Sequence, residues 1–221
     1  MRKLRWVGLV VLVGSLFALS GCLLDPDPVA NFTWSPQEPI ARTDVQFTDA
    51  STDSAGLLGV FGTAGIKTRN WDFDDSENST SESPKHRFDV GGEYEVALTV
   101  EDGSGNTSTV TKSVFVSPSV DGVWTGTIRD ANGVPVSLEL RLTHSPMGIS
   151  GMVSVPQVVV LPQLITGAAF DTATRTLTFQ MGGTFWQFRG TLGPNETTLS
   201  GFWFNAIGIQ INTWEVTRAG A

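Results

Sequence analysis

Short runs in which apolar and polar residues alternate dominate the chain from Val29 onward. In an extended strand every second side chain lies on the same face, so this period of two predicts β-strands with one buried face. No sustained 3.6-residue spacing of apolar positions is present, and glycine, proline, asparagine and aspartate separate the runs. The pattern therefore predicts an all-β protein in which helix is scarce.

The first set of runs occupies residues 29–117. The clearest of them are 30–34, 45–47, 71–73 and 94–100. About seven strands in roughly 90 residues are typical of a sandwich of two sheets. We expect the apolar positions of these runs to face one another between the sheets.

The second set, residues 120–218, is a succession of hairpins. Four apolar residues at every second position of 136–142 alternate with polar ones, and Asn132-Gly133 before them suits a two-residue turn. About eight antiparallel strands in this length predict an up-and-down barrel, which has no exposed sheet edge. The large residues expected to fill its interior are Trp124, Phe179, Trp186, Phe188, Trp203 and Trp214.

Aromatic residues also fall on both faces of two of these strands, although only one face can be the core. Phe202, Trp203 and Phe204 are consecutive, and Phe185 precedes Trp186. The surplus side chains either pack against other parts of the protein or form a binding surface. A glycine-rich insertion at 55–65 raises the same question. The candidate binding surface comprises Phe185, Phe202, Trp203, Phe204, Leu57, Leu58 and Phe61.

The first 21 residues read as a signal peptide. Three basic residues precede an apolar run at 6–18, which is shorter than the roughly 20 residues that cross a bilayer. The next residues, Leu19, Ser20, Gly21 and Cys22, resemble a bacterial lipobox. The resemblance implies cleavage before Cys22 and attachment of diacylglycerol and an acyl chain to it, which anchors the protein stably. The alternative is a plain cleaved signal with an unpaired cysteine.

Residues 22–28 would then be a short tether at the membrane. Leu23 stands where the lipoprotein family has an aspartate in proteins kept at the inner membrane. We therefore expect a cell-envelope protein, in the outer membrane where the cell has one and on the outer face of the plasma membrane otherwise.

Charge and cysteine content narrow the choice of partners. The chain has 22 acidic and 14 basic residues, a net charge of −8, which becomes about −11 when the leader is removed. Nucleic acid is therefore not an expected partner. Acidic residues are concentrated before residue 120, which indicates two differently built domains. Cys22 is the only cysteine, so each domain depends on its own apolar core.

Three motifs in the first domain carry a family resemblance. Trp71-Asp72-Phe73, Pro84-Lys85-His86-Arg87-Phe88 and the run 91–102 resemble a PKD domain. The resemblance implies an immunoglobulin-like sandwich that serves as a spacer or interaction module on an exported protein. The family has glycines where Asp74 and Ser76 stand, so these residues must adopt the left-handed backbone that glycine adopts more easily.

The second domain has a fainter resemblance. Its opening 122–126, its glycine-terminated strands at 149–151 and 199–201, and its close at 211–214 resemble avidin-type and other calycin barrels. The resemblance implies a small barrel, but no ligand-binding residues can be transferred from it.

Candidate chemistry is sparse. Asp72, Asp74, Asp75 and Glu77 form the densest carboxylate cluster, and calcium takes six to eight oxygen ligands. The spacing fails the EF-hand pattern, so we expect a solvated acidic turn and no metal site, with weak calcium binding as the alternative. His86 is expected to make a polar contact at the sandwich edge. Neither it nor His144 has a sequence motif of a nucleophile or metal centre, which predicts that the protein is not an enzyme.

The sequence thus predicts a lipid-anchored, non-catalytic adhesion or scaffold module with a protein or polysaccharide partner in the envelope. One alternative is a carrier of small ligands, which requires a barrel cavity of a few hundred cubic ångströms. A more remote alternative is an accessory subunit of an exported hydrolase.

Overall fold

The computed structural model describes residues 26–54, 65–159 and 161–220. Within these ranges the protein forms fifteen strands and no α-helix, which confirms the predicted all-β class. The chain divides into two compact units. Among the described residues no helix is long and apolar enough to span a membrane. The lipobox, Cys22 and the three insertion residues Leu57, Leu58 and Phe61 lie outside the described residues.

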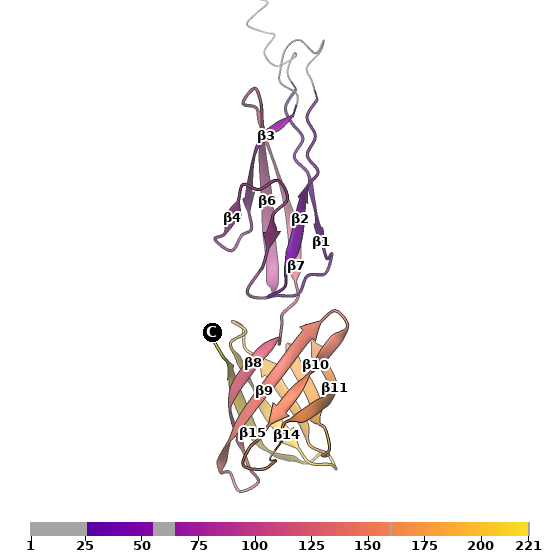
Figure 1. The fold of residues 1–221 in the computed structure, drawn as a ribbon, viewed down its shortest axis with the longest axis vertical. Helices are drawn as coiled ribbons and strands as arrows, with labels where there is room; N and C mark the ends of the chain where they lie inside the picture. Colours follow the sequence, from indigo (N-terminus) through magenta and orange to yellow (C-terminus); the bar gives the residue numbers. More distant parts are fainter. Residues whose placement is uncertain (1–25, 55–64, 160, 221) are drawn as a thin grey trace, which may run out of the picture. The chain divides into compact units, whose positions relative to one another are not determined.

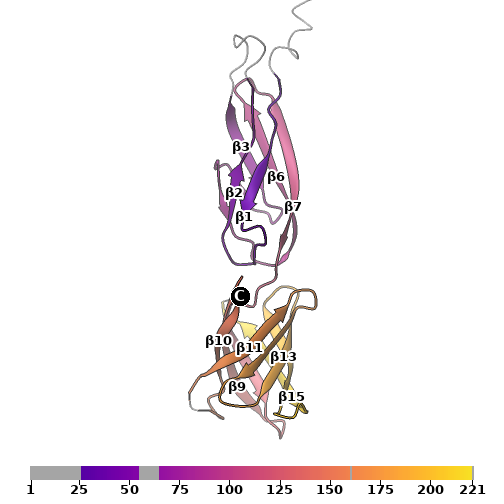
Figure 2. The same ribbon diagram turned by 90° about the vertical axis from the view of Figure 1, so that its right-hand side faces the viewer.

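The first unit is the predicted two-sheet sandwich (Figures 1 and 2). One sheet has the order β1-β2-β5 and the other the order β4-β3-β6-β7. The strands are β1 (Phe32–Ser35), β2 (Val45–Asp49), β3 (Ile66–Asp72), β4 (Asn78–Ser79), β5 (Lys85–His86), β6 (Gly92–Asp102) and β7 (Thr107–Val116).

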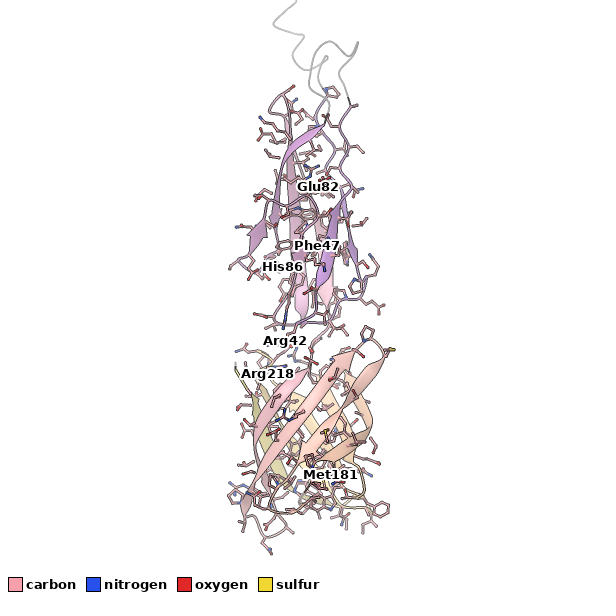
Figure 3. The ribbon with its side chains drawn as sticks, viewed as in Figure 1. Arg42, Phe47, Glu82, His86, Met181 and Arg218 are labelled. Atoms are coloured by element: carbon pink, nitrogen blue, oxygen red, sulfur yellow. The ribbon has the colours of Figure 1, made fainter. Side chains whose placement is uncertain are left out.

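Aromatic rings from both sheets fill the space between them. Phe32 comes from β1, Phe47, which Figure 3 labels, comes from β2, and Trp71 comes from β3; all three are fully buried. The rings of Phe32 and Trp71 meet edge to face with centroids 5.2 Å apart. The indole of Trp71 donates to the carbonyl of Ser81 at 2.9 Å, so its polar atom is satisfied inside the core.

The second unit is a closed barrel in which each strand pairs with its neighbours in sequence and β15 pairs with β8. Every pairing is antiparallel, as the prediction of an up-and-down barrel requires. The strands are β8 (Gly122–Arg129), β9 (Pro135–Ser145), β10 (Gly148–Ser154), β11 (Gln163–Asp171), β12 (Thr176–Met181), β13 (Gln187–Leu192), β14 (Thr198–Phe204) and β15 (Gln210–Arg218).

Side chains fill the barrel, and five of the six predicted interior aromatics are buried there; Trp186 is half-buried near one end. Trp214 occupies space that a glycine leaves open. A Cβ atom added to Gly190, in β13, would lie 2.3 Å from Cζ2 of the Trp214 ring, which comes from β15. The Trp214 indole donates to the carbonyl of Phe202 at 3.0 Å. Gly190 is therefore a packing requirement of the core.

A buried arginine closes one end of the barrel. Arg218 donates to the carbonyls of Ser119 and Glu196, both at 2.8 Å, and its guanidinium lies 4.1 Å from the ring centre of Trp124. Burial lowers the pKa of Arg218 to about 10. Figure 3 shows Arg218 near this end and the buried Met181 toward the other.

Candidate binding surface of the barrel

The predicted aromatic surface divides between the two faces of the barrel wall. Phe202 is 42% exposed on the outside and Phe204 is half-buried, whereas Trp203 between them points inward and is only 6% exposed. Trp203 therefore belongs to the core and Phe202 to the surface, as the alternation of a strand requires, while the pairing with β15 shifts register between Trp203 and the half-buried Phe204. Phe185 is not on a strand. It lies in the loop between β12 and β13, where it is 77% exposed.

Phe185 belongs to a larger apolar group at one end of the barrel. In an up-and-down barrel alternate hairpin loops emerge at the same end, so the loops β8–β9, β10–β11, β12–β13 and β14–β15 lie together. Each of them exposes at least one large apolar side chain, with exposures from 47% to 78%. We call this group the apolar rim; it comprises Val134, Val158, Leu161, Phe185, Ile207 and Ile209.

The opposite end of the barrel differs in character. Its loops, β9–β10, β11–β12 and β13–β14, expose one large apolar side chain among their described residues, Met147, which is 98% exposed. Single exposed apolar residues are ordinary on protein surfaces, but several gathered on one end are not. The rim end is therefore the end of the barrel at which covering the exposed apolar side chains is most favourable.

A hollow of about 240 Å³ opens at the rim end of the barrel. Trp186 and Trp203 line it, with ring centroids 4.8 Å apart. The indole N–H of Trp203 donates to the carbonyl of Arg129 at 2.9 Å. The one polar atom of this side chain is therefore paired, and the rest of the ring is apolar. The aliphatic lining comes from Ile128, Val136, Val155 and Val158.

Side chains hold the rim loops through their backbone amides. The carboxylate of Asp130 accepts from the amides of Asn132 and Val134, both at 2.8 Å. Asn205 accepts in the same way from Ile207 at 3.2 Å and Ile209 at 3.0 Å. The loops therefore present apolar side chains on turns in which several backbone amides are hydrogen-bonded within the protein.

Charge is almost missing from the rim loops. The segments 130–134, 155–162, 182–186 and 205–209 contain one ionisable residue, Asp130, and the turn uses its carboxylate. Arg129 precedes the first segment and donates to the carbonyl of Gly133 at 2.9 Å. The rim loops therefore carry little charge with which to attract a charged ligand.

A second hollow, of about 440 Å³, lies on the barrel wall beside Phe202. Its lining is mostly polar, and it combines the exposed ring of Phe202 with opposite charges from Arg129 and Glu215. The remaining lining residues are Thr127, Ser200, Gly201, Thr213 and Trp214.

The carboxylate cluster of the sandwich forms a hydrogen-bonded turn. Asp74 and Ser76 both have the left-handed backbone that the sequence predicts, with φ of 62° and 74°. Asp72 accepts from the amide of Asp74 at 3.0 Å, and Asp75 from the amide of Glu77 at 3.1 Å. In the described part of the chain no three acidic, histidine or cysteine side chains converge as metal ligands.

Structural contacts engage both histidines. Nε2 of His86 lies 2.7 Å from a carboxylate oxygen of Asp75, and its ring stacks on Phe73 at 3.9 Å, so the predicted polar contact is present. His144 is half-buried, and its Nδ1 accepts from the amide of Val120 at 3.4 Å. Burial lowers the pKa of His144, and the carboxylate of Asp121 acts in the opposite direction.

Comparison with known proteins identifies relatives of the first unit. Residues 26–117 match the PKD domain family. Collagenase ColA of Clostridium perfringens is 43% identical over 51 residues, which are 23% of this chain and 5% of the collagenase. A microbial collagenase of Vibrio alginolyticus is 45% identical over 47 residues, 21% of this chain and 6% of that protein. The chain thus spans about a twentieth of the curated relatives it matches.

Two solved structures also align with this chain. The PKD1 domain of the Vibrio cholerae metalloprotease PrtV is 30% identical, with a TM-score of 0.34, and the match covers 41% of this chain and 98% of that domain. A carbohydrate-binding module of the β-sandwich superfamily aligns with 88% of this chain and 85% of its own at 17% identity, with a TM-score of 0.37. That identity and TM-score are too low for the module's ligand to bear on this chain.

Proposed function

We propose that the chain, whose residues 26–117 match the PKD domain family, is a non-catalytic interaction module of the cell envelope, in which the barrel binds a partner through the apolar rim. Export by the leader and acylation of Cys22 are part of the proposal, and they hold the module at the membrane. The collagenase matches involve about 50 residues, so they give no support to a catalytic role.

The observation that carries the proposal is the concentration of exposed apolar side chains on four loops at one end of a closed barrel. Full burial of one such side chain is worth about 1.5–3 kcal/mol. A dissociation constant of 1 μM corresponds to a binding free energy of about 8 kcal/mol. Covering two or three of these side chains therefore supplies a substantial part of that free energy before polar contacts are counted.

The wall hollow beside Phe202 supports a second candidate function, the binding of a polysaccharide. An exposed ring can stack on a sugar, and Arg129 and Glu215 offer a donor and an acceptor for hydroxyl groups. The carrier hypothesis has less support, because the rim hollow of about 240 Å³ is smaller than the roughly 300–1,000 Å³ of ligand pockets.

Co-sedimentation of the protein with purified cell envelopes tests the main proposal. The protein from Asp25 to the C-terminus lacks Cys22, so acylation cannot contribute to binding. We expect Phe185→Ser with Ile207→Ser to reduce sedimentation at least tenfold and the matched exposed substitution Met147→Ser to leave it unchanged. Equal binding by all three proteins would refute the rim as the binding surface.

A Phe202→Ala variant tests the second candidate in the same assay with isolated envelope polysaccharide. Loss of polysaccharide binding by this variant, with the rim variants unaffected, would place that function on the barrel wall.

A further inference from the structure

We propose that the apolar rim inserts into the hydrocarbon region of a lipid bilayer, so that the partner is a membrane surface. This inference rests on the proposed function and names the partner of the same site. Four features of the described residues support it: the kind of side chain exposed, the pairing of loop amides, the distribution of charge and the arrangement of the loops.

The exposed side chains are suited to hydrocarbon. Five of the six rim residues are aliphatic, and the sixth is Phe185. Aliphatic side chains offer neither a ring for a sugar to stack on nor a hydrogen bond to a polar ligand. The two indoles near this end do not supply a sugar-binding platform, because Trp203 is buried in the barrel and Trp186 is half-buried against it.

Polar backbone groups are costly to move into hydrocarbon unless they are already hydrogen-bonded. At the rim, Asp130 and Asn205 each accept from two loop amides, and Oγ1 of Thr184 accepts from the amide of Trp186 at 3.2 Å. In the loop β10–β11 the amides of Val158 and Val159 both donate to the carbonyl of Val155 at 2.9 Å. These seven amides would therefore keep their hydrogen bonds when the loops lose water.

The charges also favour a hydrocarbon contact over an electrostatic one. The rim loops have only Asp130 as an ionisable residue, and the whole chain carries a net charge of −8. Attraction to anionic lipid headgroups would need a basic cluster, which the described rim does not contain. Binding should therefore depend little on salt and should not require anionic lipid.

The loops are placed for contact with a plane. They emerge from four hairpins around one end of a closed barrel, so a flat hydrocarbon surface can meet them together. Charged side chains on the outer wall limit the depth, since Arg141 and Glu139 form an exposed ion pair on β9. The loops would be immersed in the upper acyl region, and the hollow among them could take the end of one acyl chain.

Flotation with pure lipid vesicles tests the inference. The protein from Asp25 to the C-terminus retains every described residue of both units and lacks the acylation site, so vesicle binding must come from the folded protein. We expect it to float with vesicles of phosphatidylcholine alone, equally in low and high salt. Phe185→Ser and Ile207→Ser should each lower the partition coefficient about tenfold, a change of about 1.4 kcal/mol. Met147→Ser should leave it unchanged.

Vesicles whose acyl chains carry bromine give a second readout. Insertion brings Trp186 close enough for its fluorescence to be quenched, and the same variants should reduce the quenching. Circular dichroism and thermal unfolding of each variant show whether it is folded, which is expected because the substituted side chains are exposed.

Failure of the inference and failure of the proposed function give different results. Binding to whole envelopes but not to pure lipid vesicles would overturn the membrane inference and leave the interaction module standing. Binding to neither would overturn both. A concentration-dependent dimer that the rim substitutions abolish, without flotation, would show that a second copy covers the rim and would also overturn the inference.

Discussion

Substitution of Gly190 by alanine should strongly destabilise the barrel. The added Cβ would lie 2.3 Å from Cζ2 and 2.6 Å from Cη2 of Trp214, whereas carbon atoms in contact normally lie about 3.5–4.0 Å apart. The ring would have to move by about 1 Å or more in a core where Trp214 is 2% exposed. Such overpacking costs about 1–3 kcal/mol.

A shift of the ring also strains the hydrogen bond from the Trp214 indole to the carbonyl of Phe202. Loss of that buried bond would add about 1–3 kcal/mol. The expected total is about 2–6 kcal/mol, measured as the change in free energy of unfolding in urea. Thr191→Ala, on the next and outward-facing position of β13, is the control and should cost less than about 1 kcal/mol.

A double-mutant cycle makes this reasoning refutable. Trp214→Leu alone should be destabilising, but Gly190→Ala should cost little in its presence because the clashing ring atoms are gone. The two effects should therefore be strongly non-additive. Additive effects, or a cost of Gly190→Ala below about 1 kcal/mol, would show that the glycine is not required by the ring.

Three further predictions concern other parts of the chain. Ser76→Gly should stabilise the sandwich by about 1 kcal/mol in thermal unfolding, because a residue with a side chain is disfavoured at φ 74°, and Ser83→Gly, at a position without a left-handed backbone, should not stabilise it. Lowering the pH through about 6.5 should destabilise the barrel, since the unfolded chain binds a proton at His144 more readily than the folded one, in which burial lowers its pKa; His144→Gln should flatten this dependence of the melting temperature on pH. Cys22→Ala should abolish metabolic labelling with an alkyne analogue of palmitate and release the protein from the membrane fraction, whereas labelling of the variant would refute the anchor.

Much of the fold could be predicted from the sequence because a strand displays its environment at every second residue. The alternation at 136–142 gave the buried face of β9 correctly, and the aromatic fillers of the barrel were identified by size. The PKD resemblance, in which glycines stand at positions 74 and 76, implied a left-handed backbone for Asp74 and Ser76, which the structure has.

The apolar rim could not be predicted in the same way. Val134 and Ile207 are more than 70 residues apart, and their loops lie at the same end only because successive hairpins of the barrel alternate between its two ends. Period-two alternation also shows that Phe202 and Phe204 lie opposite Trp203 without showing which side faces the interior. A search for aliphatic residues in alternate hairpin turns would have found the rim once the barrel topology was assumed.

The connectivity of the barrel affects which parts of its surface can be substituted without disturbing the core. Because successive hairpins alternate between the two ends, the exposed residues of the apolar rim, which we propose to meet a partner, lie outside the core on connecting loops. Substituting the exposed side chains of these loops would change the surface that the same barrel offers to a partner. The specificity of such a barrel would depend on the side chains that these loops expose.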